Sequence, residues 1–222
     1  MTANTGDAKR RKRSAGGPAP ATPAGSANSV RIIGGNWRSR RIRFPAAAAL
    51  RPTPDRVRET LFNWLQGSLG GARCLDLYAG SGALGLEALS RGAAEVVFVE
   101  RDPAVAAALA ANLRLLLEPA AATAAAPAGA RGRVIEADAL RFLAGTARRF
   151  DVVFLDPPYA EGRLAELCRL LDGGGWLAPC AFVYLERAAR DRQPALPPSW
   201  SQWRELRAGG VSASLARRVE AT

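Results

Sequence analysis

The amino-acid sequence predicts an α/β protein with a seven-stranded, mostly parallel sheet, helices on both faces of the sheet and an antiparallel hairpin at the C-terminus. Two patterns support this fold class. From residue 73 onward, apolar runs of strand length alternate with segments of helical periodicity, as expected for a parallel sheet with crossover helices. The last two strand-like runs are joined by Gly209-Gly210, which favours a hairpin.

The 222 residues suffice for one sizeable domain with short additions, and we expect three parts. In residues 1–28, the run KRRKR is flanked by Ala, Gly, Pro, Ser and Thr. This composition predicts a disordered basic tail. This tail fits a solvating role and an RNA-binding role equally well. We expect residues 29–72 to form an RNA-binding arm that consists of an arginine-rich hairpin and a helix. We expect residues 73–222 to form the α/β domain.

The first folded elements are expected from Val30 onward. VRIIGGNWRSRRIRFP alternates apolar and basic residues around Gly34-Gly35, which predicts a short hairpin with a glycine turn and one arginine-rich face. Thr53 is then expected to cap a helix, with Pro54 at its first position. Before Gly67 ends this helix, its apolar residues fall on one face: Val57, Leu61, Trp64 and Leu65.

The α/β part contains five further strand-like runs: RCLDLYAG, EVVFVERD, RVIEAD, FDVVFLD and AFVYLER. Helices are expected near residues 82–91, 139–147 and 163–171. Another helix is expected to begin with Asp102 as its N-cap and Pro103 at its first position. Residues 118–132 are of low complexity and predict a flexible insertion.

The positive charge is concentrated in the first quarter of the chain. The formal net charge is +11. Residues 1–28 contribute +4, and residues 29–58 contribute +7 from eight arginines and Asp55, whereas the remaining 18 basic and 18 acidic residues cancel. This distribution is typical of a surface that binds a polyanion.

Composition excludes several kinds of chemistry. The chain has no histidine, which rules out His-based metal sites and Ser-His or Cys-His nucleophiles. Cys74, Cys168 and Cys180 lack C-x-x-C spacing, so we expect neither a disulfide framework nor a zinc site. No apolar run is long enough to span a bilayer, and no secretory signal is visible. We therefore expect a cytoplasmic monomer that binds neither metal nor membrane.

The glycine-rich segment LDLYAGSGALGLEAL follows the first strand of the α/β part. It places Asp76 in the strand, followed by Gly80, Gly82 and Gly85, so that the backbone can approach a ligand closely and helix amides can face it. The spacing also matches the dinucleotide fingerprint, with Glu100 as the acceptor for ribose hydroxyls. The glycine loop alone is therefore also consistent with an NAD-dependent oxidoreductase.

Asp138 follows the next strand, at the same end of the sheet. It could cap the helix that begins at Ala139, and this role does not exclude contact with an adenine.

With these motifs the chain resembles the class I S-adenosylmethionine-dependent methyltransferases. The resemblance implies S-adenosylmethionine as the cofactor, with its methionine part on the glycine loop, its ribose on Glu100, and its adenine facing Asp138 and Ala139. The cofactor-binding residues that it implies are Asp76, Tyr78, Ala79, Gly80, Ser81, Gly82, Glu100, Arg101, Asp138, Ala139 and Asp156.

The segment DPPY, residues 156–159, is similar to the motif by which amino-directed nucleic-acid methyltransferases hold an exocyclic amine. An aromatic amine is a poor nucleophile until acceptors hold its N–H groups. Asp156 and the carbonyl of Pro157 would supply two acceptors, while Pro157 and Pro158 fix the backbone and remove competing donors. Tyr159 would stack on the target base. The methyl donor is already activated, so positioning should matter more than a strong base.

The segments RIIGGNWRSRRI, RPTPDRVRETLFNWL, LDLYAGSGALGLEALSRGA and FDVVFLDPPY resemble, in this order, the bacterial 16S rRNA guanine-N2 methyltransferases, the RsmD family. The resemblance implies methyl transfer to N2 of a guanine in 16S rRNA, within an assembled small ribosomal subunit. The chain departs from the pattern of this family at two places: the 118–132 insertion, and Ser214, where an aromatic residue is expected. It implies RNA contacts from Arg38, Arg40, Arg41 and Arg43, and around the pocket from Arg51, Thr53, Arg56 and Arg58.

Three alternatives remain open. An adenine-N6 DNA methyltransferase also uses DPPY, although such an enzyme usually needs a target-recognition segment for which there is little room here. An NAD-dependent oxidoreductase leaves DPPY and the basic arm unexplained. A non-catalytic RNA-binding or assembly factor could have retained the fold.

Overall fold

The structure is a computed structural model that describes residues 1–2, 28–46, 53–118 and 129–219. Nearly all of the predicted tail, Arg51 and most of the predicted insertion lie outside these ranges. The elements of the described chain are β1 (Asn28–Arg31), β2 (Arg41–Phe44), α1 (Asp55–Trp64), β3 (Arg73–Asp76), α2 (Ala83–Ser90), β4 (Glu95–Glu100), α3 (Pro103–Leu117), β5 (Arg131–Glu136), α4 (Ala139–Leu143), β6 (Phe150–Leu155), a 3₁₀ turn (Tyr159–Glu161), α5 (Leu164–Gly173), β7 (Leu177–Ala188), β8 (Trp200–Ala208) and β9 (Val211–Arg218).

The main sheet has seven strands in the order β5-β4-β3-β6-β7-β9-β8. The neighbours from β5 to β7 pair in parallel, whereas β9 runs antiparallel to both β7 and β8. The β8–β9 hairpin turns at Gly209-Gly210, and Gly209 has a φ of +59°. The predicted sheet and its terminal hairpin are therefore confirmed.

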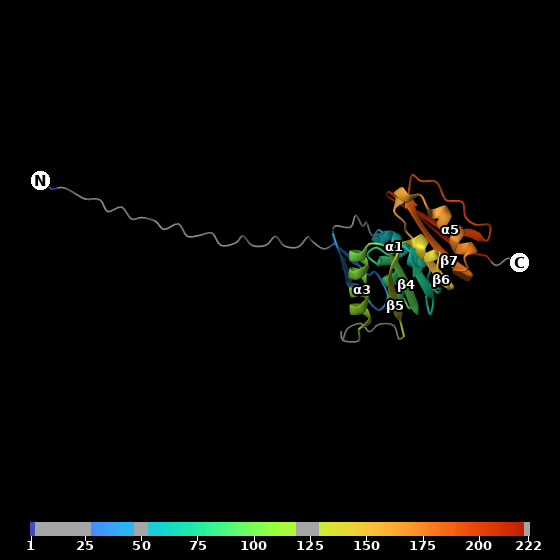
Figure 1. The fold of residues 1–222 in the computed structure, drawn as a ribbon, viewed down its shortest axis with the longest axis horizontal. Coiled ribbons are helices and arrows are strands. Elements are labelled where there is room, and N and C mark those ends of the chain that lie inside the picture. The colour runs from blue at the N-terminus through green and yellow to red at the C-terminus, as the bar shows by residue number, and fades with distance from the viewer. Residues whose placement is uncertain (3–27, 47–52, 119–128, 220–222) are drawn as a thin grey trace.

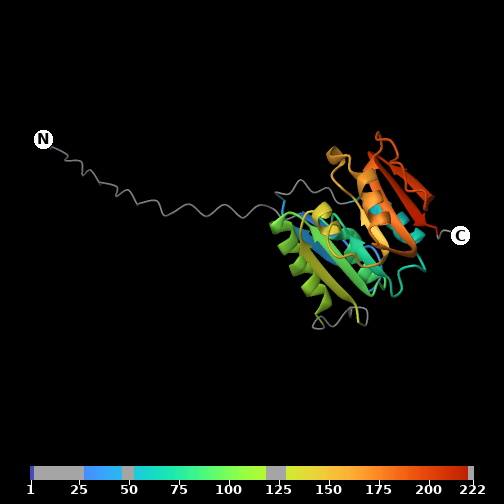
Figure 2. The ribbon, with the colours of Figure 1, turned by 45° about the vertical axis from the view of Figure 1, so that its right-hand side comes forward.

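Helices cover both faces of the sheet, as Figures 1 and 2 show. α1, α2 and α3 pack in one buried cluster that contains Phe98 and Phe154, whereas α4 and α5 pack on the opposite face with Val97 and Val153. Adjacent residues of one strand belong to different clusters because successive side chains point to opposite faces of a sheet. Burial on both faces explains why the central strands are continuously apolar.

The N-terminal strands form a separate two-stranded antiparallel sheet, in which Val30 pairs with Ile42 and Arg31 with Arg41. Val30 and Ile42 are buried, whereas Arg31, Arg41 and Arg43 are exposed, which confirms one arginine-rich face. Figure 1 shows these blue strands beside α3. Their apolar residues belong to the same buried cluster as residues of α2 and α3. The division of the chain at residue 72 stays a prediction.

The connection of this hairpin contains Gly34 and Gly35, as predicted, and the carbonyl of Gly35 accepts a hydrogen bond of 3.2 Å from the amide of Arg38. The strands end at Arg31 and resume at Arg41, and the connection between them packs onto α2. A Cβ on Gly35 would lie 1.9 Å from the carbonyl oxygen of Ser90, and Gly35 has a φ of +74°. This glycine therefore also permits close packing of the connection against the end of α2.

The start of α1 also corrects a prediction. Pro54, not Thr53, is the N-cap residue, and it makes no side-chain capping bond. The hydroxyl of Thr53 binds two carboxylates instead, as described below. The buried face of α1 includes Phe62, which is fully buried, whereas Trp64, which was predicted on this face, is only partly buried.

The two aspartate caps follow the predictions. Asp102 accepts hydrogen bonds from the amides of Ala104 and Val105 at the start of α3, and Pro103 takes the first helical position. Asp138 likewise caps α4 through the amides of Leu140 and Arg141. α4 ends at Leu143, earlier than predicted, with Ala144 as its C-cap and Gly145 following.

Candidate active site

A cleft of about 780 Å³ lies at the carboxyl ends of the parallel strands. Asp76, Glu100 and Asp156 reach it from the ends of β3, β4 and β6, Asp138 from the end of β5, and Glu186 from β7. Because parallel strands end at one edge of the sheet, residues far apart in the sequence meet there. The volume lies in the range of pockets that bind small molecules and cofactors.

Most of the predicted cofactor residues line this cleft: Asp76, Tyr78, Ala79, Gly80, Ser81, Glu100, Arg101, Asp138, Ala139 and Asp156. Gly82 does not line it, but precedes α2 in the left-handed conformation, with a φ of 78°. A Cβ on Gly85 would lie 2.3 Å from Cε1 of Phe98, so this glycine allows α2 to pack closely on β4. Of the three glycines, Gly80 lines the cleft, while Gly82 and Gly85 place α2 close behind it.

Asp76 is buried at the base of the glycine loop, where its Oδ2 accepts a hydrogen bond of 3.0 Å from the amide of Gly85. Burial raises the pKa of Asp76 to about 7, the Gly85 amide opposes this rise, and the nearby charge of Glu100 adds to it. The carboxyl group therefore changes its charge near neutral pH, inside the cleft.

Glu100 organises the same loop through both carboxylate oxygens. Its Oε2 accepts a hydrogen bond of 2.8 Å from the amide of Gly80, and its Oε1 accepts one of 2.8 Å from the amide of Asp102. Asp138 uses Oδ1 for the cap of α4. The cap role of Asp138 is confirmed, and its contact with an adenine stays a prediction.

Asp156 and Glu186 form a pair of neighbouring carboxylates linked by Thr53. The hydroxyl of Thr53 lies 2.9 Å from Oε2 of Glu186 and 3.4 Å from Oδ2 of Asp156. Burial raises the pKa of Asp156 well above its usual range, and the charges of Glu186 and Asp76 raise it further, while the Thr53 hydrogen bond lowers it. The carboxyl group of Asp156 is thus a better proton acceptor than an exposed aspartate.

Glu186 is a site residue that the sequence prediction missed. It is 2% exposed and accepts hydrogen bonds from the hydroxyls of Tyr159 at 2.9 Å, Tyr184 at 2.7 Å and Thr53. Burial, followed by the charge of Glu186, raises the pKa of both tyrosines, so they remain protonated donors. The sequence did contain an indication of this residue, namely an acidic residue inside the largely apolar run AFVYLER. A glutamate in a buried strand is rare unless it is paired, so its presence there points to a specific role.

Pro157, Pro158 and Tyr159 continue from Asp156 along the wall of the cleft. Pro157 is buried, Pro158 is exposed, and 40% of Tyr159 is exposed. The ring of Tyr159 is anchored at its hydroxyl, by the bond to Glu186, while part of its surface remains open to solvent. This arrangement is compatible with stacking, which stays a prediction.

Four of the predicted RNA-binding arginines have exposed side chains: Arg38, Arg41, Arg43 and Arg56. Arg40 is half-buried, and Thr53 is buried in the wall of the cleft. These placements do not test RNA contact, which stays a prediction for each residue.

Arg58 requires a correction. Its side chain is fully buried and donates to the carbonyls of Thr53 at 3.2 Å and Arg31 at 2.9 Å, and to Asp55 at 2.6 Å. Its Nη1 lies 3.8 Å from Glu87. Leu61 and Phe62 lie three and four residues after Arg58, so Arg58 falls on the same buried face of α1 as they do. Arg58 is therefore a structural residue and not a contact for RNA phosphate.

Glu87 is a second buried glutamate that the sequence prediction missed. Its carboxylate accepts hydrogen bonds from the amides of Ile33 at 2.7 Å and Gly34 at 2.8 Å, and from Nε of Arg91 at 2.7 Å. It thereby joins the hairpin connection to α2, the helix that follows the glycine loop.

Over the described ranges, no helix is both long enough and apolar enough to cross a membrane.

Comparison with known proteins agrees with this architecture. The family model described as conserved hypothetical protein 95 matches residues 30–217. The chain is 46% identical over 189 residues to ribosomal RNA small subunit methyltransferase D of Escherichia coli K12, covering 85% of this chain and 90% of the relative. The protein of the same name from Haemophilus influenzae is 41% identical over 185 residues, covering 82% of this chain and 91% of the relative.

A solved structure of the Escherichia coli protein yhhF superposes with a TM-score of 0.74 at 43% identity, covering 86% of this chain and 99% of that one. The sheet order, the flanking helices and this likeness show the class I methyltransferase fold. The match over residues 30–217 and the identity to the relatives show that the chain belongs to the RsmD family of methyltransferases.

Proposed function

We propose that this methyltransferase transfers a methyl group from S-adenosylmethionine to the exocyclic N2 of a guanine in 16S rRNA of the small ribosomal subunit. One observation carries the proposal: the glycine-loop cleft and the DPPY segment meet at the hydrogen-bonded group of Asp156, Thr53 and Glu186. The relatives named ribosomal RNA small subunit methyltransferase D support an rRNA substrate.

The residues of the cleft fit S-adenosylmethionine, which supplies an activated, positively charged methyl donor. Six acidic residues line the cleft and favour a cationic ligand: Asp76, Glu100, Asp102, Asp138, Asp156 and Glu186. Apolar side chains between them, including Leu84 and Val99, offer contact area for a flat base. Glu100 would hold ribose hydroxyls and Asp76 would face the amino-acid part.

The DPPY segment would hold the acceptor amine. Asp156 and the carbonyl of Pro157 accept its N–H groups, which localises the nitrogen lone pair and orients it. The raised pKa of Asp156 suits it to receive the proton that the amine releases. Glu186 does not need to touch the base, because it acts by holding Tyr159 and by its charge beside Asp156.

The exposed arginines of the arm would contact the RNA backbone. Arg41 and Arg43 lie on one face of the β1–β2 sheet, and Arg56 lies in the first turns of α1, close in sequence to Thr53 and Pro54 in the cleft wall. Phosphate neutralisation by such residues makes RNA affinity fall steeply as salt rises. The assembled particle as substrate, the cytoplasmic location and the monomeric state remain part of the proposal.

The test is tritium transfer from labelled S-adenosylmethionine to small ribosomal subunits from a strain that lacks this gene, followed by nucleoside analysis. We expect labelled N2-methylguanosine, and its loss with the Asp156→Ala variant. Label in N6-methyladenine would overturn the guanine assignment. Unchanged turnover by Asp156→Ala would overturn the role of that carboxylate.

A further inference from the structure

The outer strands of the main sheet carry an exposed cluster of aromatic and basic side chains, here called the β8 patch: Phe182 of β7, Trp203 and Arg204 of β8, and Arg217 of β9. The ring centroids of Phe182 and Trp203 lie 5.1 Å apart. Phe182 is half-buried, whereas Trp203 is 39% exposed. Aromatic residues and arginines are enriched at interfaces, and none of the roles discussed above uses these four.

A β-bulge in the edge strand β8 creates the patch. The register of β8 against β9 shifts between Gln202 and Arg204, so Trp203 is an extra residue in β8. Successive side chains of a regular strand point to opposite faces, but a bulge sets two successive residues against one partner. Trp203 contacts Phe182, and Arg204 lies opposite Leu215, a residue of the buried cluster against which Phe182 packs. The bulge therefore brings Trp203 and Arg204 to the same face.

Each arginine of the patch lies over one of its rings. The guanidinium carbon of Arg204 is 4.5 Å from the ring centroid of Trp203, and that of Arg217 is 5.8 Å from the ring centroid of Phe182. Nη1 of Arg204 donates to the carbonyl of Trp203 at 3.1 Å. Both arginines are exposed, and over the described ranges neither pairs with a carboxylate. A ring orients a guanidinium and leaves N–H groups free to bind a phosphate.

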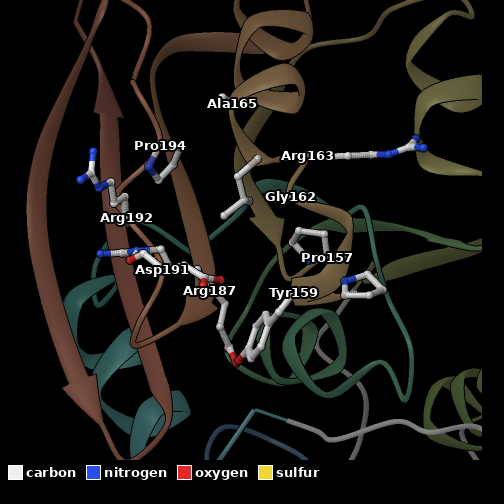
Figure 3. Close-up of a pocket in the computed structure, with 12 residues that line it drawn as sticks. Pro157, Tyr159, Gly162, Arg163, Ala165, Arg187, Asp191, Arg192 and Pro194 are labelled. Atoms are coloured by element: carbon white, nitrogen blue, oxygen red, sulfur yellow. Dashed lines mark hydrogen bonds between the residues drawn. The ribbon is translucent and has the colours of Figure 1, made fainter.

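The acidic residue next to the patch does not neutralise it. Glu205 follows Arg204 directly, and its carboxylate accepts hydrogen bonds from Nη2 of Arg187 at 3.1 Å and from the hydroxyl of Ser212 at 3.3 Å. Figure 3 shows Arg187 beside Asp191, in the cavity that α5 lines. α5 covers the other face of the sheet, so Glu205 points away from the patch.

The position of the patch suits a long ligand. It lies on the face of the sheet that α1 covers, because Phe182 and Leu206 pack against the buried cluster to which α1 contributes. Phe182 precedes Glu186 in the cleft by four residues of β7, or about 13 Å. Figures 1 and 2 show the red strands β8 and β9 on the side of the molecule opposite the blue strands β1 and β2. A ligand that contacts both ends is therefore a polymer.

We propose that the β8 patch binds backbone phosphates of the RNA substrate at a distance from the target nucleotide. Arg204 and Arg217 contact phosphate oxygens, while Trp203 and Phe182 hold the guanidinium groups in place. The inference rests on the proposed RNA substrate. Contacts with phosphates position a nucleic acid without reading its sequence, so the patch would fix the orientation of the RNA on the enzyme.

A pair of double variants tests the patch without touching the cleft. Arg204→Ala/Arg217→Ala removes both guanidinium groups. Arg169→Ala/Arg207→Ala is the matched control, because it removes the same charge from exposed positions on the other face, where Arg169 lies on α5 and Arg207 is 3.7 Å from Glu205. The KM for small ribosomal subunits is measured for both at several salt concentrations.

We expect the KM of the patch variant to rise about tenfold, and the slope of log KM against log salt concentration to fall by about 2, about one for each lost phosphate contact. The control should stay within about twofold of the wild type, with an unchanged slope. The affinity for S-adenosylmethionine and the Tm should be those of the wild type in both variants.

Four results would overturn the proposal. An unchanged KM in the patch variant would show that the patch does not bind the substrate. An equal rise in both double variants would show a general effect of charge. A raised KM with an unchanged salt slope would assign the patch to a protein of the subunit. A wild-type dimer that dissociates in the patch variant, measured by sedimentation velocity, would assign it to a second copy of the chain.

Failure of the proposed function is a separate outcome. Wild-type enzyme that methylates a different base contradicts the guanine assignment, yet the KM comparison still decides the role of the patch. Wild-type enzyme without turnover contradicts the proposed function, and the two double variants are then compared by direct binding to 16S rRNA, where equal affinities would overturn the patch proposal.

Discussion

The hydroxyl of Tyr159 donates a hydrogen bond of 2.9 Å to Oε1 of Glu186, a residue on β7. The DPPY loop is therefore held by a neighbouring strand and not by its own backbone alone. The same carboxylate also accepts from Tyr184 and Thr53. The orientation of the aromatic ring thus depends on a buried acid from another part of the chain.

The ring of Tyr159 should matter more than its hydroxyl. Tyr159→Phe keeps the stacking surface and leaves Glu186 two hydroxyl partners, so we expect kcat/KM to fall about threefold. Tyr159→Ala removes the surface and should lower it about a hundredfold, as base–aromatic stacking contributes about 1–3 kcal/mol. Methyl transfer to small ribosomal subunits measures both. Equal losses in the two variants would show that the hydroxyl anchor is the essential part.

The charge of Glu186 should set the pH dependence of methyl transfer. Glu186→Gln removes a negative neighbour of Asp156, which lowers the pKa of Asp156 and moves the acid limb of the kcat profile to lower pH. Thr53→Val removes a hydrogen bond that lowers this pKa, so the limb should move to higher pH. Shifts in the same direction would contradict the assignment of the acid limb to Asp156.

Cofactor affinity should rise as the pH increases through about 7, the pKa to which burial raises Asp76. A cationic ligand binds the ionised carboxylate better, and this form of the free protein predominates above that pKa. Calorimetric titration of S-adenosylmethionine between about pH 5.5 and 8.5 measures the effect. Asp76→Asn should bind more weakly, with a flat profile over this range. A flat profile for the wild type would contradict this electrostatic role.

Arg56 and Arg58 form a matched pair on α1 with opposite expectations. Arg58→Ala leaves Asp55 and Glu87 without this guanidinium and should lower the free energy of unfolding by about 3–5 kcal/mol, the usual cost of removing one partner of a buried ion pair. Arg56→Ala, at an exposed position, should change it by less than about 0.5 kcal/mol and weaken RNA binding instead.

Urea unfolding and RNA-substrate KM separate the two effects. Normal stability of Arg58→Ala with a raised KM would restore Arg58 to the RNA-binding surface and contradict the structural role.

Local patterns of sequence predicted most of the fold. Strand-length apolar runs predicted the central strands because a parallel sheet is buried on both faces. Asp102-Pro103 and Asp138 predicted two helix starts because a carboxylate accepts from the first free amides of a helix. The glycine loop and DPPY predicted the main walls of the cleft, and all four residues of DPPY line it.

Long-range partners decided what the local patterns could not. Thr53 is a residue type that often caps helices, but its hydroxyl contacts Glu186 and Asp156, which the sheet brings next to it. Gly35 lies in the hairpin connection, as its sequence predicted, but its close contact with Ser90 follows only from the packing of that connection on α2. Arg58 belongs to an arginine-rich stretch, but helical periodicity turns it into the core beside Glu87.

The sequence by itself therefore determined the fold class, the glycine loop, the DPPY segment and the arginine-rich N-terminal strands, because each depends on residues close together in the chain. The tertiary structure alone decided the carboxylate pair at Asp156, the anchor of Tyr159, the burial of Arg58 and the β8 patch. These features depend on the order of the strands in the sheet, which brings β7 beside β6, and on which side chains lose contact with water. Neither can be read from any single segment of the sequence.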